Sequence, residues 1–293
     1  MKVGDLLRET TLRLRSARLH FGHGTASARD EASWLVGHVL GIHPGDVHLH
    51  TKHQATSRQL ARIRRLAERR IRERIPLAYL LKEAWLDGRT FHVDRRVIVP
   101  RSYISELLRE KLRPWVRRPV RRVLDLCTGS ACLAILAALA YPKAKVDASD
   151  LSAAALEVAR INVDRYGLAR RIRLLRSDLF RAIAGERYDL ILTNPPYVDA
   201  RTMCSLPKEY QHEPRGALAG GEDGLDFVRR ILDEAAAHLA PNGWLVCEVG
   251  DSRRALERAF PLLSFTWPET SEPDACVFVL EREQLPVRNI LPD

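Results

Sequence analysis

The sequence contains few cysteines, and their spacing excludes two kinds of small scaffold. The five cysteines are Cys127, Cys132, Cys204, Cys247 and Cys276. An odd number of scattered cysteines without a CxxC pair predicts neither a disulfide framework nor a zinc module, and it favours a reduced, cytoplasmic location. His48, His50 and His53 lie close together in the sequence, but no carboxylate or cysteine follows at a metal-ligand spacing. We therefore expect loop residues there and no bound metal.

Long hydrophobic runs are also missing. The longest apolar run covers residues 131–141, which is far shorter than the roughly 20 residues needed to span a bilayer. The first residues of the chain become charged within a few positions and contain no apolar core of a signal peptide. The sequence thus predicts neither a membrane span nor export.

Acidic residues are outnumbered, with 37 Asp and Glu against 47 Lys and Arg, which gives a formal net charge of +10. Residues 1–80 hold 15 Lys and Arg against 7 Asp and Glu, so most of the excess belongs to the N-terminal part. Such a charge favours partners rich in phosphate or carboxylate. At roughly 150 residues per domain, a chain of 293 residues predicts about two domains.

The basic N-terminal part has the periodicity of amphipathic helices over residues 3–19, 28–40 and 57–75, and Pro76 ends the third. The third helix also carries a stripe of arginines, namely Arg58, Arg62, Arg65, Arg69 and Arg72. This stripe is either a solvated helix face or a surface that meets RNA or an RNA-bound protein. No aromatic residue interleaves it, so base stacking is not indicated.

The rest of the chain has a different pattern. Residues 90–93 and 97–100 predict a hairpin around Asp94-Arg95-Arg96. From residue 121, β-rich runs alternate with helical patterns, which is typical of a doubly wound α/β sheet. The expected strands cover residues 123–127, 145–149, 172–175, 188–193 and 244–249, and the expected helices include 152–166 and 225–238. Residues 265–267 and 276–281 could close the sheet as an antiparallel pair. We therefore expect a helical docking domain (1–84), a hairpin and linker (85–120) and an α/β domain (121–293).

A turn of small residues follows the first strand of the α/β domain. Asp125 and Cys127 lie at the end of that strand, and the turn consists of Thr128, Gly129, Ser130 and Ala131. Such a turn lets a ligand approach the backbone beside a helix N-terminus. Asp150 ends the next strand, where an acidic side chain can accept hydrogen bonds from both ribose hydroxyls. An ordinary tight turn between strand and helix is the alternative.

The turn contains no GxGxxG, which disfavours a dinucleotide. A mononucleoside ligand such as S-adenosylmethionine needs no pyrophosphate cradle. Asp178 follows the third strand, where it is placed either to accept a hydrogen bond from an adenine amino group or to cap a helix or turn.

The turn Asn194-Pro195-Pro196-Tyr197 follows strand 188–193, at the edge where open α/β sheets bind ligands. Its prolines fix φ and remove two donors, so Asn194 Oδ1 and the Pro195 carbonyl become rigid acceptors. An amide or aromatic amine nitrogen is a poor nucleophile because its lone pair is delocalised. Acceptors that hold its two hydrogens orient this nitrogen toward an electrophilic methyl group, and Tyr197 would pack against the planar target.

With the stretch LDLCTGSAC, this turn resembles the class I methyltransferases that modify the glutamine side-chain amide in proteins, the HemK/PrmC and PrmB group. The resemblance extends over nearly the whole chain, and the words EAWLDG, VPRS, LPKEYQHEP and LSFTW are most similar to the PrmB branch. Members of that branch methylate a glutamine in protein three of the large ribosomal subunit. The resemblance implies a Rossmann-like sheet with a smaller helical N-terminal domain, and formation of N5-methylglutamine from S-adenosylmethionine.

The resemblance also implies roles for individual residues. The methionine part of the cofactor would lie on the turn, its ribose on Asp150 and its adenine on Asp178, while Asn194 and the Pro195 carbonyl would hold the glutamine amide. The candidate catalytic and substrate-binding residues are Asn194, Pro195, Pro196 and Tyr197. The candidate cofactor-binding residues are Asp125, Cys127, Thr128, Gly129, Ser130, Ala131, Asp150, Asp178 and Asn194.

Three positions depart from the family pattern. Ala131 stands where glycine is usual, which adds a methyl group beside the cofactor. Tyr103 replaces a proline, and Pro273-Asp274-Ala275-Cys276 replaces a glycine-rich turn.

Three other functions remain as alternatives. They are a release-factor glutamine methyltransferase, an adenine-N6 nucleic-acid methyltransferase and a catalytically silent ribosome-binding protein. The sequence contains no separate base-flipping recognition domain, which favours a protein substrate. We expect a large-subunit ribosomal protein or an assembling ribosomal particle as partner, with RNA contact through the basic N-terminal domain.

Overall fold

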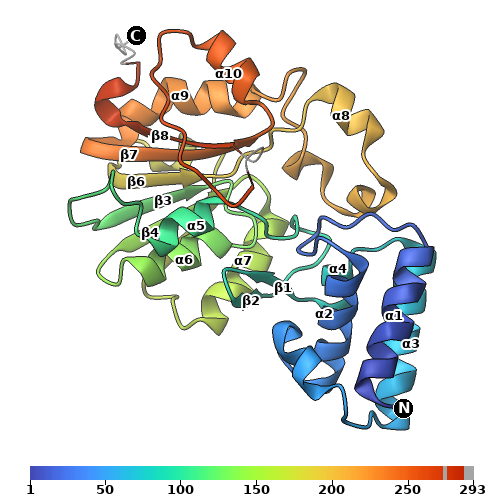
Figure 1. The fold of residues 1–293 in the computed structure, drawn as a ribbon. Helices are drawn as coiled ribbons and strands as arrows, with labels where there is room; N and C mark the ends of the chain where they lie inside the picture. Colours follow the sequence, from blue (N-terminus) through green and yellow to red (C-terminus); the bar gives the residue numbers. More distant parts are fainter. Residues whose placement is uncertain (273–275, 287–293) are drawn as a thin grey trace.

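The computed structural model describes residues 1–272 and 276–286, which form a helical N-terminal part and a larger α/β part (Figure 1). The N-terminal helices are α1 (Val3–Ser16), α2 (Ala28–Leu40), η1 (Pro44–His50), α3 (Ser57–Glu73) and α4 (Leu77–Leu81). The three predicted helices are all present. Helix α2 begins where the Ser27 side chain accepts a hydrogen bond from the Asp30 N–H, and α3 begins with a capping box between Thr56 and Gln59.

The predicted hairpin around Asp94-Arg95-Arg96 is wrong in position. The observed hairpin pairs β1 (Ala84–Leu86) with β2 (Arg89–Phe91). Its two-residue turn is Asp87-Gly88, and both residues have positive φ (51° and 68°). This Asp-Gly pair meets the demand of a tight hairpin for left-handed backbone at both central residues, whereas the Asp94 segment only turns between two extended stretches.

Six strands within the described residues form one sheet, in the order β5-β4-β3-β6-β7-β8. They are β3 (Arg122–Leu126), β4 (Lys145–Asp150), β5 (Ile172–Arg176), β6 (Tyr188–Thr193), β7 (Leu239–Gly250) and β8 (Cys276–Glu281). All neighbours are parallel except β7 and β8, so the predicted antiparallel closing strand is present. Residues 265–267 contribute only an isolated bridge between Thr266 and Val279.

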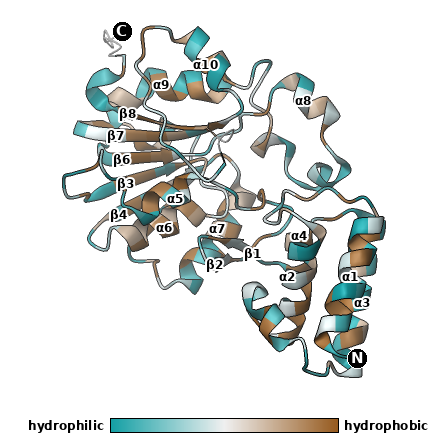
Figure 2. Ribbon diagram, viewed as in Figure 1, coloured by the Kyte–Doolittle hydropathy of each residue, from teal (hydrophilic) through white to brown (hydrophobic). Residues whose placement is uncertain are grey.

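Helices cover both faces of this sheet (Figure 1). They are α5 (Ile104–Arg109), α6 (Cys132–Ala140), α7 (Ala153–Arg165), α9 (Asp226–His238) and α10 (Arg253–Ala259), whereas α8 (Ala200–Ser205) lies apart from the sheet, beyond the ends of its strands. Short helical turns are η2 (Arg181–Ile183), η3 (Lys208–His212), η4 (Arg215–Ala217) and η5 (Arg282–Gln284). Figure 2 shows apolar residues along much of β7 and β8, as expected for strands buried between helices.

The strand order places the two motifs singled out in the sequence side by side. Strand β3 has β4 on one side and β6 on the other, and its last residue, Leu126, is paired with Thr193 at the end of β6. The turn after β3 and the turn after β6 therefore start next to each other, at the point where an open α/β sheet changes direction. The departure at Pro273-Asp274-Ala275 lies outside the described residues. Among residues 1–272 and 276–286, no helix is long and apolar enough to cross a membrane.

Candidate active site

The turn after β3 is built on a buried carboxylate. Asp125 Oδ2 accepts hydrogen bonds from Thr128 Oγ1 (2.5 Å) and from the Ala134 N–H (2.9 Å). This carboxylate therefore connects the strand to the start of the turn and to the first residues of α6. Burial raises the pKa of Asp125 to about 7, although these two hydrogen bonds act to lower it. Asp125 Oδ1 is also buried and has no hydrogen-bond partner among the described residues.

Left-handed backbone recurs within this turn, at Cys127 (φ 57°), Gly129 (φ 54°) and Ala131 (φ 63°). A Cβ on Gly129 would meet no atom within 4 Å, so this face of the turn is open. Ala131 is fully buried and lies at the N-cap of α6. Ser130 is buried as well, and its carbonyl accepts a hydrogen bond from the Asn162 side chain of α7 (2.9 Å).

Asp150 turns its carboxylate toward this turn. Its Oδ2 accepts from the Gly129 N–H (2.9 Å) and its Oδ1 from the Ser152 N–H (2.8 Å), while burial raises the pKa of the carboxyl group. Burial also raises the pKa of the Cys127 thiol, and the charges of Asp150, Asp125 and Asp178 raise it further. The charges of all three candidate carboxylates therefore act on the Cys127 side chain. Asp178 is partly exposed and forms an ion pair with Arg230 (2.9 Å).

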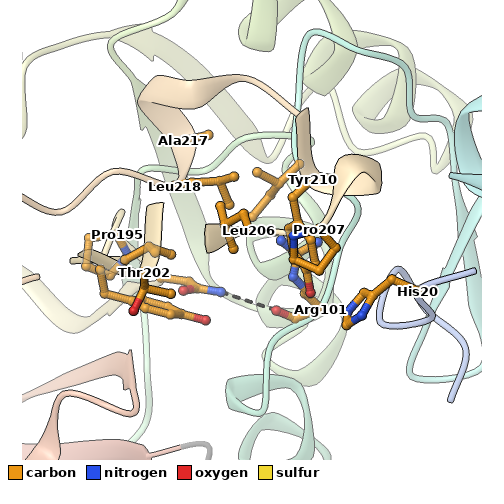
Figure 3. Close-up of a pocket in the computed structure, with 13 residues that line it drawn as sticks. His20, Arg101, Pro195, Thr202, Leu206, Pro207, Tyr210, Ala217 and Leu218 are labelled. Atoms are coloured by element: carbon orange, nitrogen blue, oxygen red, sulfur yellow. Dashed lines mark hydrogen bonds between the residues drawn. The ribbon is translucent and has the colours of Figure 1, made fainter. Parts of the chain in front are cut away.

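The turn after β6 presents one amide oxygen to an open space. Asn194 Nδ2 donates a hydrogen bond to the Arg101 carbonyl (3.3 Å), shown as the dashed line in Figure 3. Because a backbone carbonyl can only accept, the amide nitrogen must face it and Asn194 Oδ1 faces away. Pro195 and Pro196 are buried and supply no N–H group to this turn.

Tyr197 is fixed by close backbone contacts. A Cβ on Gly250 would lie 2.5 Å from Tyr197 Cε2, so only glycine leaves room for the ring beside the end of β7. A Cβ on Gly220 would lie 2.7 Å from the Tyr197 Cα, which shows how closely the following loop approaches the turn. That loop is tied down by two main-chain bonds, from the Val198 N–H to the Leu218 carbonyl and from the Gly220 N–H to the Val198 carbonyl.

A cavity of about 270 Å³ opens beside this turn, and Figure 3 shows the side chains around it. Its lining comes from four parts of the chain: a loop of the N-terminal part, the linker, the Asn194 turn and residues 202–218. The lining residues are His20, Ile98, Arg101, Asn194, Pro195, Tyr197, Val198, Thr202, Leu206, Pro207, Tyr210, Ala217 and Leu218. The wall is mostly apolar with a few polar groups, the composition expected of a site for a neutral side chain.

Sequence reasoning missed the linker residues of this cavity. Arg101 forms two hydrogen bonds of 2.7 Å to Glu213, whose side chain is completely buried. Burial alone would raise the pKa of Glu213, but the charge and hydrogen bonds of Arg101 hold it at about 2. Arg101 lies in the motif VPRS and Glu213 in the motif LPKEYQHEP, two motifs that carry the family resemblance. These motifs are the signal in the sequence that points to the two residues.

A second buried carboxylate holds the linker from β7. Glu248 Oε2 accepts from Ser102 Oγ (2.6 Å) and from the Tyr103 N–H (2.9 Å), and burial raises its pKa to about 7. Tyr103, one of the departures from the family pattern, thus contributes an N–H group that a proline would lack. Among the described residues, no group of three or more His, Cys, Asp or Glu side chains could hold a metal ion.

Comparisons with known proteins agree with this arrangement. Residues 5–81 match the family model described as PrmC N-terminal domain, and residues 103–209 match Methyltransferase small domain. The chain is 52% identical over 283 residues to the ribosomal protein uL3 glutamine methyltransferase of Bordetella pertussis, covering 96% of this chain and 95% of the relative. It is 50% identical over 285 residues to the protein of the same name from Neisseria meningitidis serogroup B, covering 97% and 94%.

Solved structures are similar at the level of the fold. A methyltransferase from Pyrococcus furiosus has a TM-score of 0.50 and 22% identity, covering 67% of this chain and 90% of that one. The hMettl16 catalytic domain in complex with MAT2A 3'UTR hairpin 6 has a TM-score of 0.52 and 16% identity, covering 77% and 81%. Together with the observed strand order, these similarities confirm the predicted doubly wound, class I methyltransferase fold.

Proposed function

Since this chain belongs to the family of ribosomal protein uL3 glutamine methyltransferases, we propose that it methylates the side-chain amide of a glutamine in protein uL3. The product is N5-methylglutamine. The observation that carries the proposal at the site is the orientation of Asn194, whose amide oxygen is free to accept a hydrogen bond beside an apolar cavity. A site built for a charged substrate would need an opposite charge there, and the one guanidinium in the lining, that of Arg101, is already paired with Glu213.

The turn after β3 fits S-adenosylmethionine as the methyl donor. Asp125 Oδ1 is a buried acceptor without a partner in the described part of the chain, and the face of Gly129 is open. Asp150 keeps further lone pairs that can accept from the ribose hydroxyls. Asp178, which is paired with Arg230, would accept from the adenine amino group. When bound, the cofactor supplies an electrophilic methyl group on a sulfonium sulfur.

The turn after β6 prepares the amide nitrogen for attack. Asn194 Oδ1 and the Pro195 carbonyl accept hydrogen bonds from the two amide hydrogens of the glutamine, which orients the nitrogen and stabilises positive charge as it develops. Tyr197 packs against the planar amide. Methylation makes the nitrogen more acidic, so water or an acceptor carbonyl can remove its proton afterwards and a strong base is not required.

The helical domain supplies the docking surface for a ribosomal partner. Arg58, Arg62 and Arg65 on α3 are exposed, and none of them forms an ion pair within the described residues. Arg69 and Arg72 instead pair with Glu73 on the same helix, so their end of the stripe is a solvated face. The three free arginines support a contact with ribosomal RNA phosphates, which should weaken as salt is added. A ribosomal substrate also implies a cytoplasmic location.

The test uses the purified chain, S-adenosylmethionine with a labelled methyl group and uL3 from cells that lack this gene. Label on one glutamine of uL3 supports the proposal. Asn194→Ala should lower the transfer far more than it lowers calorimetric binding of the cofactor, because its amide oxygen is proposed to hold the substrate amide. Transfer to a release factor or to adenine would support the alternatives instead, and absence of cofactor binding would favour a silent ribosome-binding protein.

A further inference from the structure

The Asn194 side chain depends on its surroundings for its orientation. A primary amide has nearly the same shape at both ends, and the torsion that exchanges its oxygen and nitrogen is soft. If the group turned over, it would present two hydrogens to the two hydrogens of the substrate amide. The hydrogen bond from Asn194 Nδ2 to the Arg101 carbonyl (3.3 Å) is the contact that selects the productive end (Figure 3).

The Arg101 carbonyl lies on a segment that has no helix or strand to hold it, since residues 97–102 are irregular. Glu213 replaces that support. Its carboxylate receives two 2.7 Å hydrogen bonds from the Arg101 guanidinium, and its Oε1 also accepts from the Val99 N–H (2.9 Å). One buried carboxylate therefore fixes both the main chain before Arg101 and the end of its side chain.

We propose that Glu213 is a positioning residue for methyl transfer, which acts by holding Arg101 so that the Arg101 carbonyl keeps Asn194 Oδ1 directed at the substrate amide. This inference rests on the proposed function of Asn194. It adds a residue 19 positions after Asn194, on the segment 206–214 that also lines the cavity with Leu206, Pro207 and Tyr210.

Arg101 is the cation that balances the negative charge of Glu213. Besides Arg101, the titratable side chains around it include Tyr79, Tyr210 and His23, whose Nε2 lies 3.7 Å from Glu213 Oε2 and whose side chain is 4% exposed. Burial lowers the pKa of His23 although Glu213 acts to raise it, so burial favours the neutral form of this ring. The Tyr210 ring contacts both His23 (4.4 Å between centroids) and the Arg101 guanidinium (5.4 Å to the centroid), which closes the remaining side.

The test compares Glu213→Gln with the wild-type enzyme at saturating uL3. Glutamine keeps the size of the side chain, but its NH2 group faces the Arg101 guanidinium. The pair of hydrogen bonds between the two side chains is therefore lost. We expect kcat to fall roughly tenfold to a hundredfold, as for a misplaced reacting group, while the cofactor dissociation constant stays within about twofold. The matched control is Asp147→Asn, which breaks a similar pair of hydrogen bonds from Arg173, away from the cavity. This variant should leave kcat and the cofactor dissociation constant unchanged.

A double-mutant cycle separates positioning from general stability. If Glu213 acts through Asn194, Glu213→Gln should cause no further loss of kcat in an Asn194→Ala background, whereas independent effects would multiply. A kcat of Glu213→Gln within about twofold of wild type would overturn the inference. Losses of kcat that multiply in the double mutant would overturn it as well. Arg101→Lys tests the same contact if Glu213→Gln does not fold, because lysine keeps the charge without the fork.

The Asn194→Ala and Glu213→Gln variants distinguish an error in the role of Asn194 from an error in the role of Glu213. If Asn194→Ala retains full transfer, the proposed function of the Asn194 turn is wrong whatever Glu213 does. If Asn194→Ala is inactive and Glu213→Gln is fully active, the turn keeps its role and only the positioning role of Glu213 is wrong.

Discussion

Single residues in the turn after β3 have an unusual backbone. Cys127 and Ala131 have left-handed φ values, which cost a residue with a side chain roughly 1 kcal/mol relative to glycine. Both are held in place by the network around Asp125, whose Oδ2 binds the Thr128 hydroxyl and the Ala134 N–H. The strain lies where the cofactor is proposed to bind, as is common at ligand sites.

The Ala131 methyl group can be tested directly. In Ala131→Gly, relief of the left-handed backbone is offset by loss of a buried methyl group, about 0.8 kcal/mol, so the unfolding free energy should change by less than about 1 kcal/mol. Because this methyl group is completely buried in the hydrophobic core, the cofactor dissociation constant should stay close to that of the wild type. Denaturant unfolding and calorimetric titration measure the two quantities, and a large loss of stability would contradict the expected balance.

Glu248 should make stability depend on pH. Its pKa is about 7 in the folded protein against an ordinary 4.5, so folding takes up a proton between these values. The stabilisation is complete below pH 4.5 and is lost as pH rises through 7, by at most roughly 3 kcal/mol. Glu248→Gln resembles the protonated acid and should remove this loss.

The measurement is the difference in unfolding free energy between wild type and Glu248→Gln at pH 5 and at pH 8. We expect the wild type to lose stability relative to the variant as pH rises, since Asp125 contributes equally to both proteins. A difference that is the same at both pH values would show that Glu248 is already ionised at pH 5.

At the scale of elements, the sequence predicted what short-range patterns encode. Strand β6 and helix α2 were predicted with their observed bounds, because an apolar run and an amphipathic repeat each end at a turn or a cap. The predicted position of the hairpin is wrong because β-rich residues continue after residue 89, whereas the tight turn is formed by Asp87-Gly88. The Asn194 turn was found because its four residues are contiguous, whereas Arg101 and Glu213 are 112 positions apart and meet only in the fold.

Asn162 connects three elements and provides a prediction at this scale. Its side chain donates to the carbonyls of Ser130 (2.9 Å) and His92 (3.0 Å) and accepts from the His92 N–H (2.6 Å), so α7 ties the cofactor turn to the segment after β2. Asn162→Ala leaves these buried groups unpaired and should cost roughly 3 kcal/mol in unfolding free energy. Arg160→Ala, an exposed position on the same helix, is the matched control. Equal stability of the two variants would contradict the role of Asn162.

At the scale of the molecule, a buried charge cluster joins the helical part to the cavity. Arg70 of α3 is 1% exposed and pairs with Glu31 of α2 (2.6 Å) and with Glu209 of η3 (3.4 Å). Glu209 also accepts from the His20 N–H (3.1 Å), and His20 lines the cavity. The helical N-terminal part and the segment 206–214 are therefore joined by Arg70.

Removing Arg70 should affect both parts. Arg70→Ala leaves two buried carboxylates without this cation and should lower the unfolding free energy by roughly 3 kcal/mol or more, with a higher KM for uL3. Arg69→Ala removes an exposed neighbour on α3 whose one ion pair within residues 1–272 and 276–286 is with Glu73, so the stability and KM of this variant should stay close to wild type. Thermal unfolding and steady-state kinetics of the two variants make the comparison, and similar behaviour would contradict the joint role of the cluster.

The predicted membership of the glutamine methyltransferase group is confirmed by the relatives, whereas the roles of the site residues remain proposals.

The most direct test of the central claim is mass spectrometry of ribosomal proteins from cells with and without this gene, with the gene restored as wild type or as Asn194→Ala. We predict that uL3 lacks the mass of one methyl group on one glutamine without the gene, regains it with wild type and does not regain it with Asn194→Ala. A fully methylated uL3 in cells without the gene would contradict the account.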